Sequence, residues 1–515
     1  MLPLPTLSTT ILTLLLYPLA KALYNILFHP LSSSKIPGPT SWSASRVPFL
    51  ARLLRGTLIH DLEKLHLKYG PIMRIAPDEV AFAHPDAWTE IMQPRQGKRQ
   101  FLKDAMWWST PNNKSMMNAI DVGDWARMRK TLTPGFTKGA LRMQEAVVQR
   151  YVSLLIERLR ERVHAASSGG PDLDPDKRKG VTVDVFPWVN FLTFDVFGDL
   201  GFGESFRCLE NGRYHPWITL IFDNVKGIAF VNAAKYYPAL DWVLQWCIPA
   251  SLRKVQEDHF QHVVDRVQRR MNWEVVREDI MSHLLKEAKE NGSTGMSMDE
   301  IYYSFAGLTV AGSETTATVL GGVLNYLSAL PEKRRIVVDE VRAAFADEGE
   351  ITLSAVEERC GYLTAVVNEG LRLCPPVPWV LPRRVPEGGE TVCGVWIPGG
   401  TAVSISQYAL NRSPSLFHQP SSFVPERWLE SSTADPSSPF YRDHRAAVQG
   451  FSVGPRACLG KHLAWVEMRL CLARLLWGFD VEEREGRALR WEELRTFLLV
   501  EKKPIEVVLS ERDMA

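Results

Sequence analysis

The chain has 515 residues, of which 45% are hydrophobic and 23% are charged, a composition typical of a folded globular protein. Its 60 Lys and Arg residues nearly balance its 59 Asp and Glu residues, and the resulting net charge of +1 argues against a general nucleic-acid binder. The length exceeds that of most single hydrophobic cores and allows more than one domain.

The first segment, residues 2–28, is mostly apolar. A membrane span needs about 20 apolar residues, which this segment roughly provides, although Pro18 interrupts it. A cleaved signal peptide is the alternative, with Ala20-Lys21-Ala22 as its cleavage site. The segment lacks a basic start, however, and its hydrophobic pattern continues to Phe28. We therefore predict an uncleaved N-terminal membrane anchor.

Helical periodicity dominates the chain from about residue 125 onward. It predicts one helix over residues 140–166 and another over residues 252–290, and the polar stretch 167–180 predicts a loop. Signals for strands are sparse, and they lie at residues 70–82, 391–398 and 497–509. The sequence therefore predicts a mainly α fold with a minor β region.

A long apolar helix is predicted from the capping box Ser297–Glu300 to Leu330, where Pro331 ends it. Such a helix should lie at the centre of the fold. Its middle reads Ala-Gly-Ser-Glu-Thr-Thr over residues 311–316. A glycine costs about 0.5–1 kcal/mol in a helix interior, and Thr315 can bond back to the carbonyl four residues earlier and open the helix. This motif indicates either a small oxygen-binding groove or a packing contact between small residues.

Two charged motifs precede the run of residues that contains Cys458. Glu369 and Arg372 are three residues apart and share a helix face, which in isolation predicts a surface ion pair. The segment Pro425-Glu426-Arg427 supplies a further arginine. Together, Glu369, Arg372 and Arg427 could form a network that braces the following loop.

Cys458 lies in the run Phe451–Gly460, which contains two glycines, a proline and an arginine. The chain has seven cysteines and no close CxxC pair, which argues against a disulfide framework and against a structural zinc site. An iron porphyrin, by contrast, needs a single thiolate, which favours O–O cleavage. Glycines let the backbone curl tightly and aim N–H groups at the sulfur. We therefore predict Cys458 as the ligand of a haem iron.

Several cationic residues suit the two haem propionates, which must be paired when they are buried. Trp125 and Arg129 share a helix face, and Arg456 lies two residues before Cys458. Arg383 offers a third guanidinium. Singly, each arginine is better explained as a surface charge, but as a set they favour propionate binding.

These motifs together resemble the cytochrome P450 monooxygenases over nearly the whole chain. The resemblance rests on residues 311–316, Glu369-x-x-Arg372, Pro425-Glu426-Arg427 and the run Phe451–Gly460, which occur in the order found in that family. The N-terminal segment resembles that of microsomal members. The amino-acid sequence around residues 24–31 and 452–461 is similar to that of fungal secondary-metabolism hydroxylases of the isotrichodermin C-15 type.

The resemblance implies a P450 fold, in which a long central helix lies over haem b and a loop supplies the cysteine ligand. It implies that Cys458 is the axial thiolate and that Arg456, Trp125, Arg129 and Arg383 bind the propionates. The domains it implies are a membrane anchor over residues 1–30, a Pro/Gly hinge over residues 31–40 and a haem-thiolate catalytic domain over residues 41–515.

The resemblance also assigns roles around the cofactor. Glu314 and Thr315 become an acid–alcohol pair at the oxygen site, and Glu369, Arg372 and Arg427 become structural. The residues expected to line an apolar substrate pocket are Trp107, Phe305, Leu308, Val377 and Val380.

The resemblance further implies that electrons come from NADPH–cytochrome P450 reductase, with cytochrome b5 as a second candidate donor. The chain has no GxGxxG fingerprint of its own after a predicted strand. Lys461, Arg127 and Lys130 are candidates for a basic docking patch. The expected location is the endoplasmic reticulum membrane, with the catalytic domain in the cytosol and no nucleic-acid partner.

The expected reaction is hydroxylation or epoxidation of a lipophilic small molecule, such as a terpenoid or polyketide, with O2. Two alternatives stay open at this point. One is a haem-thiolate enzyme of the same fold that performs dehydration, ring expansion or oxidative coupling. The other is a haem-binding electron carrier, which would have no need of the proton relay that Glu314 and Thr315 would form.

Overall fold

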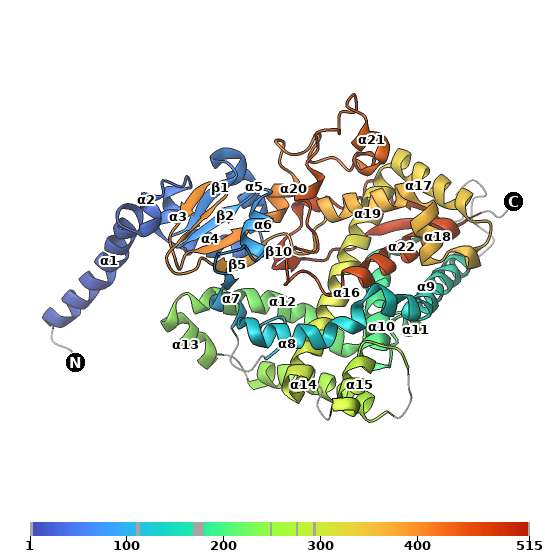
Figure 1. Ribbon diagram of the computed structural model, residues 1–515, viewed down its shortest axis with the longest axis horizontal. Helices are drawn as coiled ribbons and strands as arrows, with labels where there is room; N and C mark the ends of the chain where they lie inside the picture. Colours follow the sequence, from blue (N-terminus) through green and yellow to red (C-terminus); the bar gives the residue numbers. More distant parts are fainter. Residues whose placement is uncertain are drawn as a thin grey trace.

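The computed structural model describes residues 4–109, 114–167, 180–247, 250–273, 277–291 and 295–512. The molecule is mainly helical and has a small, mostly antiparallel β region (Figure 1), as predicted. The predicted loop over residues 167–180 lies almost entirely outside the described residues.

The N-terminal helices lie with a five-stranded sheet, to which a later part of the chain contributes two strands. Its helices are α1 (Leu4–Leu27), α2 (Pro30–Ser33), α3 (Thr40–Ala44), α4 (Val47–Arg55), α5 (Leu58–Tyr69), α6 (Ala87–Met92) and α7 (Ala105–Trp108). The sheet has the order β1-β2-β8-β5-β3 and consists of β1 (Ile72–Ala76), β2 (Glu79–Phe82), β8 (Ala402–Ile405), β5 (Val380–Arg384) and β3 (Leu102–Lys103). Strands β1 and β2 form the antiparallel hairpin predicted over residues 70–82.

Helices form most of the remaining structure. They are α8 (Val122–Leu132), α9 (Lys138–Ser167), α10 (Val185–Phe202), α11 (Cys208–Asn211), α12 (Pro216–Lys235), α13 (Pro238–Cys247), α14 (Ala250–Met271), α15 (Ser282–Asn291), α16 (Met298–Ala329), α17 (Pro331–Ala344), α18 (Leu353–Arg359), α19 (Gly361–Leu373), α20 (Gln407–Asn411), α21 (Glu430–Ala434) and α22 (Lys461–Gly478). Short 3-10 helices are η1 (Thr133–Phe136), η2 (Glu348–Glu350), η3 (Pro425–Trp428), η4 (Arg445–Ala447) and η5 (Trp491–Glu493).

Three small sheets complete the fold. The three-stranded sheet has the order β4-β12-β9, with β4 (Val181–Asp184), β12 (Glu506–Glu511) and β9 (Phe479–Glu483). Two hairpins are formed by β6 (Glu390–Val392) with β7 (Val395–Ile397) and by β10 (Thr496–Phe497) with β11 (Leu499–Val500). The first of these hairpins confirms the prediction over residues 391–398. The C-terminal strands exist, but β12 pairs with β4 and β9 and not with its neighbour β11.

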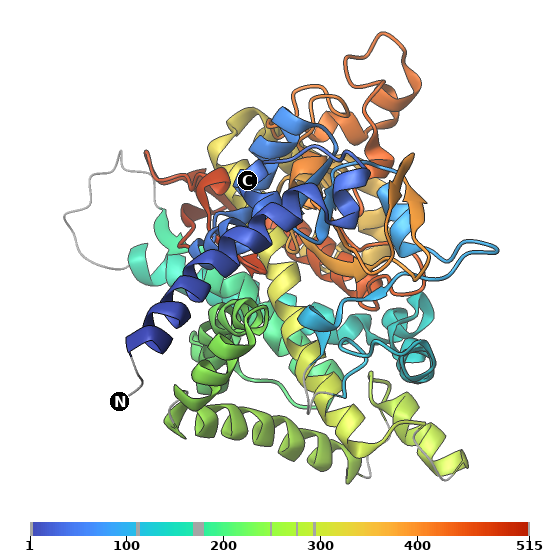
Figure 2. The same ribbon diagram turned by 90° about the vertical axis from the view of Figure 1, so that its left-hand side faces the viewer.

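Helix α16 crosses the middle of the molecule (Figures 1 and 2) and confirms the predicted long central helix. The Ser297 hydroxyl accepts a hydrogen bond from the backbone N–H of Glu300, whose carboxylate accepts one from the N–H of Ser297. Neighbouring helices approach α16 closely at two glycines. A Cβ on Gly322 would meet Cys374 Sγ at 2.4 Å, and one on Gly321 would meet Phe186 at 2.6 Å.

The single helix predicted over residues 252–290 is wrong, because α14 ends at Met271 and α15 begins at Ser282. Just before α15, the backbone N–H of Ile280 donates to the carbonyl of Leu200 in α10 at 2.9 Å. Arg270 Nε binds Asp279 at 2.9 Å, and both side chains are buried. This buried ion pair joins the end of α14 to the residues just before α15, where the charged pattern alone indicates a continuing helix.

Helix α1 projects from the body of the molecule (Figure 1), and its last turns pack on the N-terminal part. The side-chain amide of Asn25 donates to the carbonyl of Ala44 at 2.8 Å. In the part of the chain that the structure describes, no helix combines the length and apolar character needed to cross a membrane. The predicted anchor therefore stays a prediction. The predicted hinge packs on β1, where Gly38 leaves no room for a Cβ beside the Arg74 carbonyl.

Candidate haem-thiolate site

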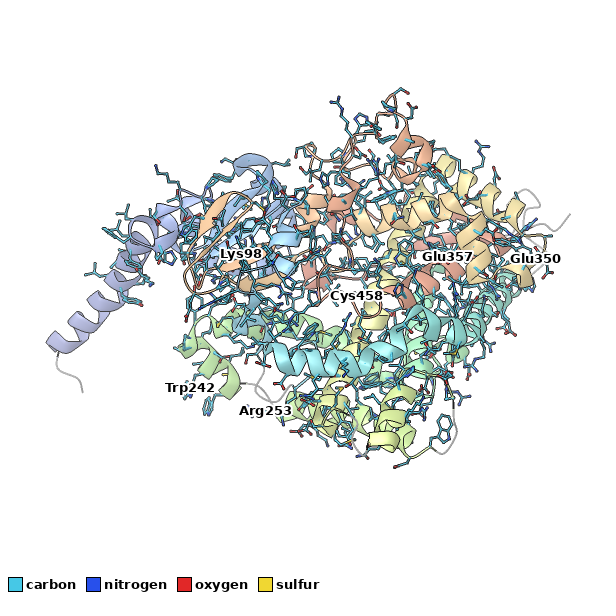
Figure 3. The ribbon with its side chains drawn as sticks, in the orientation of Figure 1. Lys98, Trp242, Arg253, Glu350, Glu357 and Cys458 are labelled. Atoms are coloured by element: carbon cyan, nitrogen blue, oxygen red, sulfur yellow. The ribbon has the colours of Figure 1, made fainter. Side chains whose placement is uncertain are left out.

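The loop before α22 holds Cys458 in a tightly curled backbone. Gly454 has a φ of +79°, and a Cβ at this position would lie 2.4 Å from the carbonyl oxygen of Met92. Only glycine satisfies both constraints at little cost. The backbone N–H of Cys458 donates to the carbonyl of Phe451 at 2.9 Å, which closes the loop. Figure 3 labels Cys458 near the middle of the molecule, just before α22, which packs against α16.

The surroundings of Cys458 suit a metal-bound thiolate. Its side chain is exposed, whereas Cys208, Cys360, Cys374 and Cys471 are buried. Although solvent reaches this side chain, many protein atoms surround the sulfur at longer range. This surrounding protein raises the pKa of the thiol, because it disfavours the charged form. A backbone hydrogen bond from Gly460 and the charges of Arg129 and Lys461 act in the opposite direction. These residues favour the thiolate, which is the form that binds iron.

Arg129 and Trp125 reach the cysteine loop from α8, as their shared helix face predicts. Nη1 of Arg129 donates to the carbonyl of Ala457 at 2.9 Å. The guanidinium carbon of Arg456 lies 4.7 Å from the centre of the Trp125 ring, within the range of a cation–π contact. The structure therefore brings together three of the four residues that the sequence assigns to the propionates.

Arg383 lies in β5 and joins Arg456 in a group of cations that form no ion pair with a carboxylate among the described residues. Nη1 of Arg383 donates to the carbonyl of Phe101 at 2.9 Å, and Nη1 of Arg456 donates to the carbonyl of Ala119 at 2.6 Å. The pKa of each guanidinium is lowered to about 10, at Arg456 by burial and at Arg383 by burial together with the charge of Arg456. Lys103 is a third member, and its pKa is lowered by burial and by the two arginines.

This group of cations requires an anion. Among the described residues, none of Arg383, Arg456 and Lys103 forms an ion pair with a carboxylate, although the charge of Asp121 favours the charged form of Arg456. Haem brings two carboxylates, which fit this need. The residues present therefore fit a haem whose iron is bound by Cys458 and whose propionates face these cations. The sequence analysis missed Lys103, because a lone lysine in a short strand carries no motif.

The network predicted around Glu369 is fully buried and larger than expected. Arg372 binds both carboxylate oxygens of Glu369 at 2.7 and 2.9 Å, and Nε of Arg427 binds the same carboxylate at 3.1 Å. Trp428 Nε1 donates to it at 2.8 Å, and Arg427 also pairs with Asp443. Burial opposes the charged form of Glu369, but Arg372 and Arg427 outweigh it and lower the pKa of the carboxyl.

Thr315 and Glu314 lie on different sides of α16. The hydroxyl of Thr315 donates to the carbonyl of Ala311 at 2.6 Å, as predicted from the sequence. Glu314 is 3% exposed and pairs with Lys502, while the side-chain amide of Asn190 donates to it at 3.2 Å. In this structure the carboxylate is therefore turned toward α10 and the C-terminal segment. The sequence analysis missed Lys502, which lies 188 residues from Glu314 along the chain.

The residues expected to line a substrate pocket differ in their surroundings. Trp107 and Phe305 belong to the core: Trp107 Nε1 donates to the hydroxyl of Tyr236 at 2.8 Å, and Phe305 is fully buried against Phe202. Both were predicted from apolar character, which does not distinguish a pocket wall from a core. Leu308 and Val380 keep part of their surface, and Val377 is 39% exposed.

The candidate docking residues also differ in whether they form ion pairs within the protein. Arg127 is engaged within the protein, because it pairs with Glu300 at 2.7 Å and with Asp124 at 3.0 Å. Lys130 and Lys461 are exposed. Two of the three predicted cations therefore remain available at the surface for an acidic partner.

Comparisons with known proteins extend over nearly the whole chain. The family model described as Cytochrome P450 matches residues 37–509. The chain is 41% identical over 501 residues to cytochrome P450 monooxygenase lcsI of Purpureocillium lilacinum, covering 96% of this chain and 92% of that protein. It is 40% identical over 488 residues to cytochrome P450 monooxygenase cpaH of Aspergillus oryzae, covering 94% and 90%.

A third relative is named for its reaction. The chain is 37% identical over 505 residues to averantin hydroxylase of Dothistroma septosporum, covering 97% of this chain and 90% of that protein. These relatives are fungal monooxygenases, and members of their family bind haem iron through a cysteine thiolate. The fold, the cysteine loop, the cations beside it and these similarities agree: the chain belongs to the cytochrome P450 family and is a haem-thiolate monooxygenase.

Proposed function

We propose that the protein hydroxylates or epoxidises a lipophilic small molecule of fungal secondary metabolism, of terpenoid or polyketide type. O2 is the oxidant, and NADPH–cytochrome P450 reductase is the electron donor. The hydroxyl of Thr315, which donates to the Ala311 carbonyl in the middle of α16, carries this proposal, because an oxygenase needs a hydroxyl beside the oxygen site. Bound haem supplies the oxygen-activating iron, and its thiolate ligand favours O–O cleavage.

Within this proposal, the protein orients the cofactor and controls protons. Cys458 would bind the iron, and Arg129, Arg383 and Arg456 would bind the haem carboxylates. Thr315 presents its hydroxyl at the oxygen site and passes a proton there. Glu314 would supply the proton that Thr315 passes on, which requires its carboxyl to be protonated and released from its contacts with Lys502 and Asn190.

The substrate class is supported by apolar surface on α16. Several residues in the middle of this otherwise buried helix keep partial exposure; they are Ala306, Gly307, Leu308, Val310, Ala311, Gly312 and Thr315. Val377 and Val380 add exposed or half-buried aliphatic surface from the segment after α19. The name of the relative averantin hydroxylase supports hydroxylation as the reaction.

We also propose that the protein is held at the endoplasmic reticulum membrane with its catalytic domain in the cytosol. Helix α1 exposes apolar side chains over its last turns, among them Tyr17 at 67% and Leu19 at 67%. Helix α13, toward the same end of the molecule (Figures 1 and 3), exposes Trp242 at 70% and Trp246 at 81%. Tryptophan is enriched where protein meets the lipid interface.

The reaction is tested with full-length protein, the reductase, NADPH and isotopically labelled O2. A screen of terpenoids and polyketides for a haem spin-state shift first identifies a ligand. The proposal predicts that this ligand gains one labelled oxygen atom, and that product formation requires both NADPH and O2. Turnover without the reductase, or a product without labelled oxygen, would favour dehydration, ring expansion or coupling and would overturn the proposal.

A further inference from the structure

Lys502 reaches the central helix from the C-terminal part of the chain. It lies between β11 and β12, and its ammonium pairs with the carboxylate of Glu314 in α16. This segment is fixed beside the start of α10: the backbone N–H of Ile505 donates to the Asp184 carboxylate at 2.9 Å, and the Ile505 carbonyl accepts from the N–H of Val185 at 3.0 Å. The fold therefore holds Lys502 next to Glu314.

Both carboxylate oxygens of Glu314 are engaged on the side of α16 that faces α10 and the C-terminal segment. Lys502 contacts Oε2, and the side-chain amide of Asn190 donates to Oε1 at 3.2 Å. The hydroxyl of the next residue, Thr315, donates to the Ala311 carbonyl at 2.6 Å. Consecutive residues of a helix do not face each other. Glu314 therefore has to leave Lys502 before its carboxyl can turn toward the Thr315 hydroxyl.

Lys502 is the more exposed partner of this ion pair. Its side chain keeps 19% of its surface, whereas the side chain of Glu314 keeps 4%. Its ammonium also lies 5.0 Å from the centre of the Phe186 ring in α10. Asn190, which binds the other carboxylate oxygen, is fully buried, and its amide does not titrate. Of these two partners of Glu314, only Lys502 can take a proton from water and pass it to the carboxylate.

A buried ion pair can lose both charges when one proton moves. Burial disfavours charged groups, and it lowers the pKa of Lys502, while the charge of Glu314 acts in the opposite direction. Transfer breaks one N–H bond of the Lys502 ammonium and forms an O–H bond at Oε2 of Glu314. A neutral amine and a neutral carboxylic acid result, and the amine regains a proton from water. The attraction that holds Glu314 is then lost, so one step both protonates and releases the acid.

We propose that Lys502 is a positioning residue that acts on the oxygen site through Glu314: its ammonium holds the carboxylate away from Thr315, and its proton, once transferred, lets Glu314 turn toward Thr315 as an acid. This inference rests on the proposed proton-transfer roles of Glu314 and Thr315. It locates the entry of protons at the segment between β11 and β12.

Three substitutions separate a proton donor from a cation that only stabilises the fold. Lys502→Arg keeps a positive charge beside Glu314, but a guanidinium does not give up its proton in proteins. Lys502→Met removes the charge and keeps the length. Lys503→Arg is the matched control, because Lys503 is the next residue and is exposed. The melting temperature and the reduced carbon monoxide difference spectrum of each full-length protein report whether it is folded with haem bound.

The first measurement tests whether Lys502 holds Glu314. It is the infrared C–O stretching frequency of the reduced carbon monoxide complex, which senses polar groups beside the bound gas. We expect Lys502→Met to shift this frequency, because Glu314 is released toward Thr315, and we expect Lys502→Arg to match the wild type. In a Glu314→Gln background, Lys502→Met should cause no shift, because no carboxylate is left for Lys502 to hold.

The second measurement tests the proton transfer. It is the rate of NADPH oxidation by O2 with saturating reductase and without organic substrate, recorded in H2O and in D2O. We expect Lys502→Arg and Glu314→Gln each to slow this rate on the order of tenfold and to increase its solvent isotope effect. The double variant should be no slower than either single variant, because both block one transfer. Lys503→Arg should match the wild type.

The outcomes distinguish this inference from the function on which it rests. If Glu314→Gln leaves the rate and the isotope effect unchanged, the proposed proton role of Glu314 is wrong. If Glu314→Gln slows the reaction but folded Lys502→Arg protein reacts like the wild type, Lys502 acts only as a cation and the inference is overturned. An unshifted C–O frequency in folded Lys502→Met protein also overturns it. If Lys502→Met does not fold, the rate of Lys502→Arg decides alone.

Discussion

Arg383→Gln should weaken haem binding without destabilising the haem-free protein. Burial, with the charge of Arg456, lowers the pKa of Arg383 from 12.5 to about 10. At roughly 1.4 kcal/mol per pH unit, keeping Arg383 charged costs the protein alone about 3 kcal/mol. A haem propionate offsets this cost when it pairs with the guanidinium. Glutamine removes the pairing, so we expect haem to be released faster, by up to a factor of about 100.

The assay is the rate of haem transfer from the holoprotein to an excess of a haem scavenger, with the melting temperature of the haem-free protein measured in parallel. Arg384→Gln is the matched control, because Arg384 is the next residue in β5 and its Nε pairs with Asp104 at 3.1 Å. We expect no acceleration in this control. Equal haem release from Arg383→Gln and wild type would refute the assignment of this cation group to the propionates.

Three further changes test other parts of the site. Arg427→Met should cost about 3–5 kcal/mol in thermal unfolding, because it removes a buried partner of Glu369; a loss below about 1 kcal/mol would contradict a cooperative buried network. Lys502→Met should destabilise the protein by a similar amount, and adding Glu314→Gln should recover most of the loss; no recovery would show that Lys502 stabilises the fold by another route. Glu467→Gln should remove a pH dependence of stability: the folded pKa of Glu467, about 8, exceeds the ordinary 4.5, so its contribution to wild-type stability is largest below pH 4.5 and is lost as the pH rises to about 8. At pH 7 the glutamine variant should therefore be more stable by up to about 3 kcal/mol, and parallel stability–pH curves would contradict the neutral state of this carboxyl.

Local patterns in the sequence predicted the parts of the fold that local forces determine. The capping box at Ser297 and the helix-terminating Pro331 located α16, and the helical spacing of Trp125 and Arg129 placed both on one face of α8. Back-bonding of Thr315 follows from residue type and helical geometry. Each of these depends on residues within a few positions of one another, which is the range that periodicity and capping describe.

Long-range pairs could not be predicted in this way. Lys502 reaches Glu314 only because the C-terminal segment returns to the central helix, and Asp443 completes the Arg427 network without belonging to a motif. Between α14 and α15 the sequence has no proline or glycine, whereas the structure has a buried pair of Arg270 with Asp279 there. In each case the tertiary fold brings the two side chains of the pair together.

The residues predicted to line the pocket show a different limit of prediction from sequence. Phe305 and Leu308 are both apolar and lie one turn apart on α16, yet Phe305 is fully buried and Leu308 keeps part of its surface. Phe305 packs against Phe202 of α10. Apolar character alone therefore predicts that a residue leaves water, but not whether it leaves it for the core or for a ligand.

The central claim is that Cys458 binds a haem iron as a thiolate in an oxygenase. Its most direct test is the difference spectrum of the reduced protein with carbon monoxide, recorded for wild type, Cys458→Ala and the control Cys393→Ala. The strongly red-shifted Soret band of a thiolate complex should appear in wild type and in Cys393→Ala, and it should be lost in Cys458→Ala. Persistence of that band in Cys458→Ala, or its absence from haem-loaded wild-type protein, would contradict the account.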